Sequence, residues 1–374
     1  RLAGSAVYMC FQVGRVAIVT LLPSLALAAV TGFDVTACIL GMGAICILYT
    51  VLGGIEAVIW SDVLQTVVLI GGAAWALCAM TAGVDGGVSA IVSDAMTSEK
   101  LQLADMRFDF SEPTILVVIL GALFINIIPY ASDQSVVQRY LTTKDEAASR
   151  KAIWTSGLLA VPASLIFFAL GTSLWAYYRA NPESLEPTSK LDQILPFFLV
   201  DQLPAGVGGL VIAGLFAAAM SSLDSSMNSV STAFTTDFYA RFRPETTDHQ
   251  RLRVAKIATV AIGVIGTGAA LLMAALNDAS LLDTWFKIIG LFGSALAGIF
   301  ILGAISRRAG SIAGWCGLLA GALSVFLVST LTDLNGILYA AVGIMSCLVV
   351  GVVVAIFCPN QKDLQGLTLA TLRK

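Results

Sequence analysis

The feature that most constrains this chain is a series of ten long stretches without Asp, Glu, Lys or Arg. A helix needs about 20 predominantly apolar residues to cross the hydrocarbon of a bilayer. Only 12% of the 374 residues are charged, about half the share in a soluble domain. We therefore predict an all-α integral membrane protein whose ten transmembrane helices lie at residues 4–30, 35–51, 54–80, 113–139, 148–178, 204–240, 251–276, 281–305, 311–331 and 336–357.

The placement of positive charge predicts the orientation of these spans. When the connecting loops are assigned alternately to two sides, the N-terminal side receives fifteen of the 21 Lys and Arg residues. The other side receives Lys100, Arg107, Arg179 and Lys190. Cytoplasmic loops carry the excess of Lys and Arg, so we predict that both ends are cytoplasmic and that the loops 81–112 and 179–203 are extracellular. Within the second loop, residues 189–200 are expected to form a short interfacial helix.

Several classes of chemistry are disfavoured by composition. The net charge of −3 offers no basic surplus for nucleic acid. The single histidine, His249, argues against a histidine metal site or a Ser-His-Asp triad, and no phosphate-binding G-x-x-x-x-G-K-[ST] loop occurs. The seven cysteines are interpreted as packing residues. We expect a non-enzymatic protein, and any transport must be driven by an ion gradient or be passive. Because residue 1 is Arg and no cleavable leader opens the chain, we expect a fragment that lacks its N-terminus.

A polar stripe marks the sixth predicted span. Its members lie at offsets of 0, 3, 4, 7, 8 and 11, on one face of a helix: Ser221, Asp224, Ser225, Asn228, Ser229 and Thr232. One interpretation is helix–helix contact, which Ser and Thr favour in membranes. Asp224 argues against it, because a carboxylate in a span is costly unless it is paired or solvated. Hydroxyl and carboxylate oxygens together suit a small hard cation such as Na⁺.

Other charges within the spans need partners too. Asp62 lies about 13 Å from the cytoplasmic end of its span, at a depth compatible with Ser221 and Ser225, unless it is only a structural cap. Arg15 lies mid-span and must pair either with a carboxylate of the protein or with a ligand. Asp62 and Asp224 are better used on a cation, so a substrate carboxylate is the partner we favour. Lys287 can extend to the interface.

The fourth predicted span carries a helix-breaking residue. Pro129 is expected to interrupt the helical ladder there, and broken backbone at membrane depth is tolerated where it lines a cavity. Asp133 and Gln134 are interpreted as a gate or a local ion-pair network. A tight inner turn at Gly53-Gly54 is expected to separate the second and third spans.

Three segments resemble the sodium/solute symporter family: residues 49–65, residues 133–139 and the run from Ala217 to Thr232. The resemblance implies a LeuT-type inverted repeat of five helices plus five. It also implies that the chain begins at the third core helix and so should not transport by itself. On this view the chain is a single transmembrane domain. Residues 1–80 are the remainder of the first repeat, 113–305 the second repeat and 311–357 two peripheral helices.

The same resemblance implies site residues and ions. Ala218, Ser221 and Ser222 match half of the family's conserved sodium site, while Asp62, Ser222, Asp224 and Ser225 resemble a second sodium site, so one or two Na⁺ ions are expected. The family often has Ser or Thr where Asp224 stands. Asn126 matches a substrate-binding asparagine and Arg15 a carboxylate-binding arginine of the sialic-acid branch; with Tyr130 they form the predicted substrate set.

The function predicted from these observations is sodium-coupled import of a small organic solute, with sialic acid or another sugar acid favoured. The expected partners are that solute and the lipid bilayer, with no nucleic acid. The oligomeric state is left open. The alternatives are a symporter for neutral sugars or polyols, a passive channel, and a membrane sensor or scaffold that does not transport.

Overall fold

The computed structural model describes residues 1–101, 104–141, 143–184, 191–204, 206–276 and 281–360, with residues 368 and 371. The side chains of residues 29–30, 53–62, 139, 141 and 191–193 lie outside this description. All secondary-structure elements of the described residues are helices, and these residues contain no strand.

Ten helices of the described residues are long and apolar enough to cross a membrane, as predicted. The α-helices are α1 (Leu2–Thr31), α2 (Val35–Ala82), α3 (Gly87–Thr97), α4 (Ile115–Ser132), α5 (Gln134–Leu141), α6 (Glu146–Ala180), α7 (Leu191–Asp201), α8 (Val207–Phe234), α9 (Ala240–Phe242), α10 (Asp248–Leu276), α11 (Leu281–Ile288), α12 (Ala295–Ile305), α13 (Ser311–Leu331) and α14 (Tyr339–Phe357). Short 3₁₀ helices η1 (Pro182–Ser184) and η4 (Gly336–Leu338) lie in two of the connections.

Helix α2 contains two of the ten spans, residues 35–52 and 63–82. In the first span, Met42 lines a pocket together with Phe216 and Met220 of α8, and Thr50, further along the span, donates to Asp224. Between residues 68 and 72, the facing positions on α8 fall from 214 to 211. The two halves therefore run in opposite directions along α8, and the chain reverses in between. The turn predicted at Gly53-Gly54 lies in the segment whose side chains are outside the described part.

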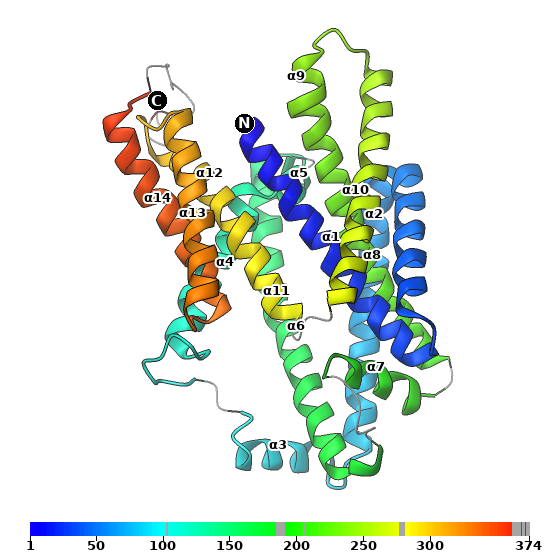
Figure 1. The fold of residues 1–374 in the computed structure, drawn as a ribbon. Helices are drawn as coiled ribbons and strands as arrows, with labels where there is room; N and C mark the ends of the chain where they lie inside the picture. Colours follow the sequence, from blue (N-terminus) through cyan, green and yellow to red (C-terminus); the bar gives the residue numbers. More distant parts are fainter. Residues whose placement is uncertain are drawn as a thin grey trace.

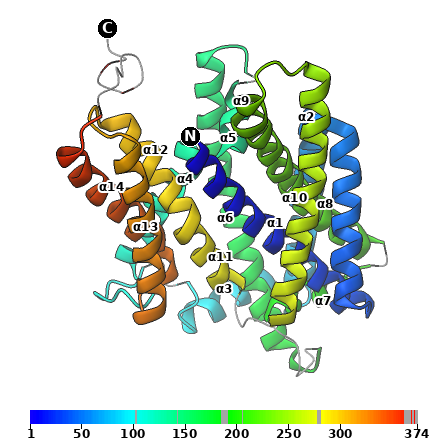
Figure 2. The same cartoon turned by 45° about the horizontal axis from the view of Figure 1, so that its top comes forward.

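Helix α1 crosses the centre of the molecule, between α11–α12 on one side and α8 with α10 on the other (Figure 1, Figure 2). The N-terminus and the α9–α10 connection lie at one end of the molecule, and α3 lies at the opposite end (Figure 1). The side chains that fill the space between α1, α2, α8 and α10 include Val16, Met42, Leu223, Met227 and Ile262, all buried. The polar residues of α1 and α8 are thus held within a packed apolar frame.

Two of the spans have an aspartate as the N-terminal cap of their helix. The Asp34 carboxylate accepts a hydrogen bond from the backbone N–H of Ala37 at 3.1 Å, and the Asp145 carboxylate accepts one from that of Ala148 at 2.7 Å. Each carboxylate satisfies one of the N–H groups that the first turn of a helix leaves free. These caps define where α2 and α6 begin.

Two spans contain a wider helical turn that the sequence did not predict. Residues Thr235–Tyr239 (η2) and Ile289–Ser294 (η3) are π-helical, so the spans predicted at 204–240 and 281–305 are not uniform α-helices. Gly293 of η3 leaves its backbone close to Phe11 of α1, and the Phe11 ring stacks on Trp285 of α11 with 6.0 Å between centroids. Such turns are frequent at functional sites.

The fourth predicted span is divided, but not at the proline. Pro129 lies inside α4, which continues to Ser132, and the chain leaves helical geometry at Asp133, whose ψ is 111°. Proline removes a hydrogen bond from the turn before it without ending the helix. The break lies at Asp133, the residue that caps the next helix. Its carboxylate accepts a hydrogen bond from the backbone N–H of Ser135 at 2.9 Å, and α5 begins there.

Candidate functional site

The polar stripe of α8 is half-buried along its centre and fully buried at its edges. Asp224 and Ser229 have no exposed surface, whereas Ser221, Ser225 and Asn228 are partly exposed. At about 100° per residue, Asp224 and Ser229 lie on opposite sides of Ser221, roughly 60° and 80° away. The stripe therefore presents a half-open face of hydroxyl groups, with its carboxylate turned to one side.

The Asp224 carboxylate is satisfied by hydroxyl groups of α2. Thr50 Oγ1 donates to Asp224 Oδ1 at 2.6 Å, and Tyr49 Oη donates a hydrogen bond to Oδ2. Tyr49 Oη also lies 3.2 Å from the carbonyl oxygen of Met220. Hydroxyl donors compensate part of the cost of burying a carboxylate. Tyr49 and Thr50 belong to a segment that the sequence analysis quoted as a motif without assigning them a role.

The predicted sodium ligands share α8. Ala218, Ser221, Ser222 and Ser225 are all partly buried, and Ser221 and Ser225 already have polar partners. The Asp62 side chain lies outside the described residues, so its predicted pairing with Ser222, Asp224 and Ser225 stays a prediction.

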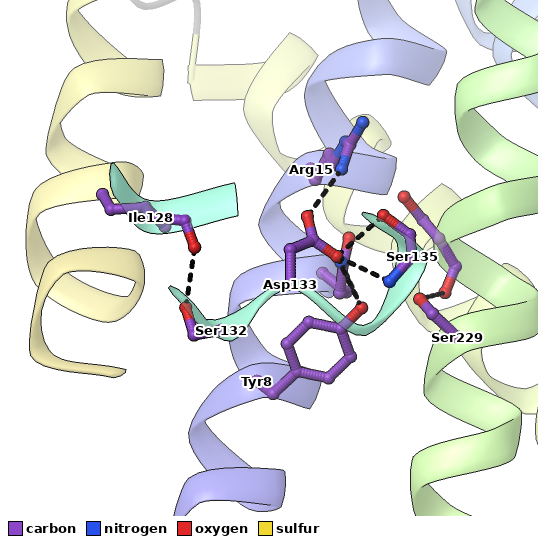
Figure 3. Close-up of polar contacts among 9 residues, drawn as sticks. Tyr8, Arg15, Ile128, Ser132, Asp133, Ser135 and Ser229 are labelled. Atoms are coloured by element: carbon purple, nitrogen blue, oxygen red, sulfur yellow. Dashed lines mark hydrogen bonds and ion pairs between the residues drawn. The ribbon is translucent and has the colours of Figure 1, made fainter. Parts of the chain in front are cut away.

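A second polar cluster joins α1 to the break between α4 and α5 (Figure 3). Arg15 Nη1 donates to Asp133 Oδ2 at 3.3 Å. Tyr8 Oη donates to Asp133 Oδ1 at 3.0 Å, and Gln12 Nε2 donates to Tyr8 Oη at 2.8 Å. The Ser135 hydroxyl also donates a hydrogen bond to Asp133 Oδ1 at 2.7 Å. One carboxylate, in the connection between α4 and α5, thus gathers donors from two helices, α1 and α5.

This cluster supplies the protein partner of Arg15 that the sequence analysis did not identify. Asp62 and Asp224 were the carboxylates considered for Arg15, and Asp133 was not among them. The helix break instead sets Asp133 beside the middle of α1. The local ion-pair network predicted for Asp133 is present, with Arg15 as its cation.

A signal for this cluster exists in the sequence and was missed. Tyr8, Gln12 and Arg15 lie at offsets of 0, 4 and 7, which is one face of a helix. The periodicity argument that found the stripe on α8 would also have found this one. What periodicity could not supply is the carboxylate on another helix that faces it.

The other predicted substrate residues lie on α4, Asn126 about two turns and Tyr130 about one turn before the break. Asn126 and Tyr130 are exposed, and Tyr130 keeps 52% of its surface. Asn126 Nδ2 donates to the carbonyl of Ala122 at 2.8 Å. Asn126 and Tyr130 are four residues apart, so these two share one face of α4. The assignment of Arg15, Asn126 and Tyr130 to a substrate stays a prediction.

Comparison with known proteins places this geometry in a family. The model of the sodium:solute symporter family matches residues 13–321. The chain is 36% identical over 356 residues to the sodium/sialic acid symporter NanT of Aliivibrio fischeri, covering 95% of this chain and 70% of the relative. It is also 36% identical over 365 residues to the sodium/sialic acid symporter SiaT of Proteus mirabilis, covering 97% of this chain and 74% of the relative.

A more distant relative is the sodium-dependent multivitamin transporter of Oryctolagus cuniculus, 30% identical over 332 residues, with 88% of this chain and 52% of the relative covered. Among solved structures, the substrate-bound outward-open state of a Na⁺-coupled sialic acid symporter matches with a TM-score of 0.88 at 34% identity, covering 97% of this chain and 75% of that one. The all-α, LeuT-type fold predicted from the motifs is confirmed by this match. The chain belongs to the sodium:solute symporter family of membrane transporters.

Proposed function

We propose that the protein is a sodium-coupled symporter that brings a small carboxylate-bearing solute into the cell, with sialic acid as the first candidate. The observation that carries the substrate class is the Arg15 side chain. It is 26% exposed in the middle of a span and uses a single N–H, on Asp133, among the described residues. A guanidinium has five N–H donors in a planar fork that fits a carboxylate. Sialic acid symporters are among the relatives of this chain.

Sodium is assigned to the half-open hydroxyl face of α8. Ser221 and Ser222, with the carbonyl of Ala218, form one half-site, and a second ion is assigned to Asp62, Asp224 and Ser225. These residues offer the hydroxyl, carbonyl and carboxylate oxygens that a small hard cation takes in place of its hydration shell. The hydrogen bonds from Tyr49 and Thr50 fix the position of the Asp224 carboxylate beside that face.

The orientation proposed is the one with the N-terminus and the α9–α10 connection in the cytoplasm. It rests on the excess of Lys and Arg in the loops on that side. A multi-pass protein in this orientation would bind its solute from the outside and release it inward, down the sodium gradient.

Uptake by the full-length protein in proteoliposomes tests the substrate class. Labelled sialic acid should accumulate only under an inward sodium gradient. Arg15→Ala should weaken binding about 10- to 100-fold, the effect of losing charge-assisted hydrogen bonds. Arg15→Lys should weaken it less, because the point charge remains without the fork.

The matched control for this test is Lys287→Ala. Lys287 is the other positive residue within a predicted span and is exposed, so its removal should leave uptake unchanged. Equal amounts of folded protein in the membrane must be verified for each variant. Normal uptake by Arg15→Ala, or a preference for a neutral sugar such as glucose, would contradict the proposal.

A further inference from the structure

The ion pair between Arg15 and Asp133 is asymmetric. Arg15 makes one hydrogen bond of 3.3 Å to Asp133 Oδ2, and its remaining N–H groups have no partner in the part of the chain that the structure describes. The Arg15 side chain is 26% exposed, whereas that of Asp133 is 6% exposed. The arginine is therefore held by a single contact at an open edge, and the aspartate is buried.

Asp133 is held in place without Arg15. Its Oδ1 accepts from the backbone N–H and the hydroxyl of Ser135 at 2.9 and 2.7 Å and from Tyr8 Oη at 3.0 Å. Gln12 Nε2 lies at 3.4 Å from the same oxygen. Figure 3 shows these donors converging on one side of the carboxylate, with Arg15 on the other. If Arg15 departs, the buried carboxylate keeps the donors that stabilise its charge.

The position of this pair connects it to the helix break. Asp133 is the residue between α4 and α5, where the backbone leaves helical geometry, and its side chain begins α5. Arg15 belongs to α1, which crosses the centre of the molecule (Figure 1). The bond between them is one of the contacts of α1 with the break, beside that of Tyr8, and a ligand that takes Arg15 away removes this one contact.

We propose that Asp133 is a specificity-determining competitor for Arg15, which a carboxylate of the substrate must displace from the Asp133 carboxylate. This inference rests on the proposed function, because it assumes that Arg15 receives the substrate. The exchange replaces one carboxylate by another on the same guanidinium, and it leaves the Asp133 carboxylate with its hydroxyl, amide and backbone N–H donors alone. A neutral solute cannot make this exchange. Asp133 therefore restricts the site to anions. When an anion binds, the loss of the Arg15 bond changes the contacts of the α4–α5 break.

The first experiment is Asp133→Asn in the full-length protein, with binding measured by calorimetry at saturating sodium. The asparagine carbonyl still accepts from Ser135, so α5 keeps its cap, but the charge that competes for Arg15 is removed. Sialic acid should bind about two- to fivefold more tightly, the factor expected for an ion pair with one partly exposed partner. The methyl ester of sialic acid, which has no carboxylate, should bind with unchanged affinity.

Ser135→Ala is the matched control, because it removes a donor to Asp133 Oδ1 without changing any charge. It should lower the melting temperature without tightening binding. If Asp133→Asn fails to tighten binding of the acid while Arg15→Ala weakens it as predicted, the competition is wrong and the proposed function stands. If Arg15→Ala binds the acid normally, the proposed substrate set itself is wrong.

A measurement on the unaltered protein covers the case in which Asp133→Asn does not fold. Hydrogen exchange of the α5 amides, residues 134–141, should become faster when sialic acid is added at saturating sodium, because Asp133, which begins α5, loses one of its bonds to α1. The methyl ester should leave exchange unchanged. Unchanged exchange with the acid would overturn the release step.

Discussion

At the scale of single residues, α8 separates side chains that bind from side chains that only pack. Ser222 is partly exposed and is among the residues that we assign to sodium, whereas Ser226, one turn further on, has no exposed surface and its Oγ has no hydrogen-bond partner among the described residues. Both are serines on the same helix, one turn apart. They therefore test whether the hydroxyl face, rather than the helix as a whole, holds the ion.

We predict that Ser222→Ala raises the sodium concentration for half-maximal uptake at least about tenfold, because one lost oxygen ligand to a cation is worth about 1.5–3 kcal/mol, as for a hydrogen bond to a charged group. Ser226→Ala should leave the sodium dependence unchanged, since its hydroxyl contacts nothing polar in the described structure. Sodium activation curves of uptake measure both. Identical curves for Ser222→Ala and the parent protein would show that the stripe only packs.

The hydroxyl groups that face Asp224 allow a second prediction. Thr50→Val is isosteric but removes the donor that lies 2.6 Å from Asp224 Oδ1. It should destabilise the folded protein by about 1–3 kcal/mol, because a buried carboxylate loses a hydrogen bond. Thermal unfolding in detergent measures the effect.

Thr20→Val is the control for that substitution. Thr20 is 1% exposed, but its hydroxyl donates only to the carbonyl of Val16 in its own helix, at 2.7 Å. That carbonyl belongs to the helical ladder, so the loss should be smaller. Equal destabilisation by the two variants would mean that the bond to Asp224 carries no particular weight.

At the scale of elements, the sequence predicts the number of spans because each span needs the same thing, a charge-free length matched to the bilayer. The helix caps at Asp34 and Asp145 mark where two of them begin. Interruptions within a span are harder to predict from local composition than the span itself. The break at Asp133 depends on a side chain that caps the next helix, and the π-helical turns η2 and η3 have no residue pattern that sets them apart.

Partners across elements are harder to predict than the elements themselves. The stripe on α8 was predicted because periodicity acts within one helix. The bonds from Tyr49 and Thr50 to Asp224, and from Arg15 to Asp133, depend on which helices face each other and at what height. That information follows from packing, where small residues set how closely two helices approach.

Helix α10 supplies a direct test of such close approach. A Cβ at Gly266 would lie 2.2 Å from Val16 Cγ1 of α1, whereas one at Gly268 would meet nothing within 4 Å. Gly266→Ala should therefore destabilise the protein by about 1–3 kcal/mol through overpacking. Gly268→Ala should be neutral or stabilising by up to about 1 kcal/mol, because alanine favours the helix.

Thermal unfolding of the two glycine variants in the same detergent distinguishes them. The α1–α10 contact also positions Arg15, which lies next to Val16. We therefore expect Gly266→Ala to weaken substrate binding as well as stability, and Gly268→Ala to do neither. Equal melting temperatures for both variants would contradict the close packing of α1 on α10.

At the scale of the whole molecule, the distribution of charge between the loops predicts the orientation in the membrane. Neither the helices nor their contacts carry this information. The predicted intracellular loops and ends hold fifteen Lys and Arg residues and the predicted extracellular loops hold four. The end of the molecule that carries the N-terminus also carries the α9–α10 connection, opposite α3 (Figure 1). Under the positive-inside rule we predict that this end faces the cytoplasm. This direction determines on which side the substrate is released.

Cysteine labelling in intact cells tests the orientation. Glu183 and Glu245 are exposed and lie in connections on opposite sides of the predicted topology. Each is replaced by cysteine in a background whose exposed native cysteines, Cys10, Cys78 and Cys358, are changed to alanine. A membrane-impermeant maleimide should label Glu183→Cys in intact cells and Glu245→Cys only after permeabilisation, because a charged reagent cannot cross the hydrocarbon to the cytoplasmic side. The reverse pattern would invert the orientation, and labelling of both in intact cells would mean that the number of spans between them is wrong.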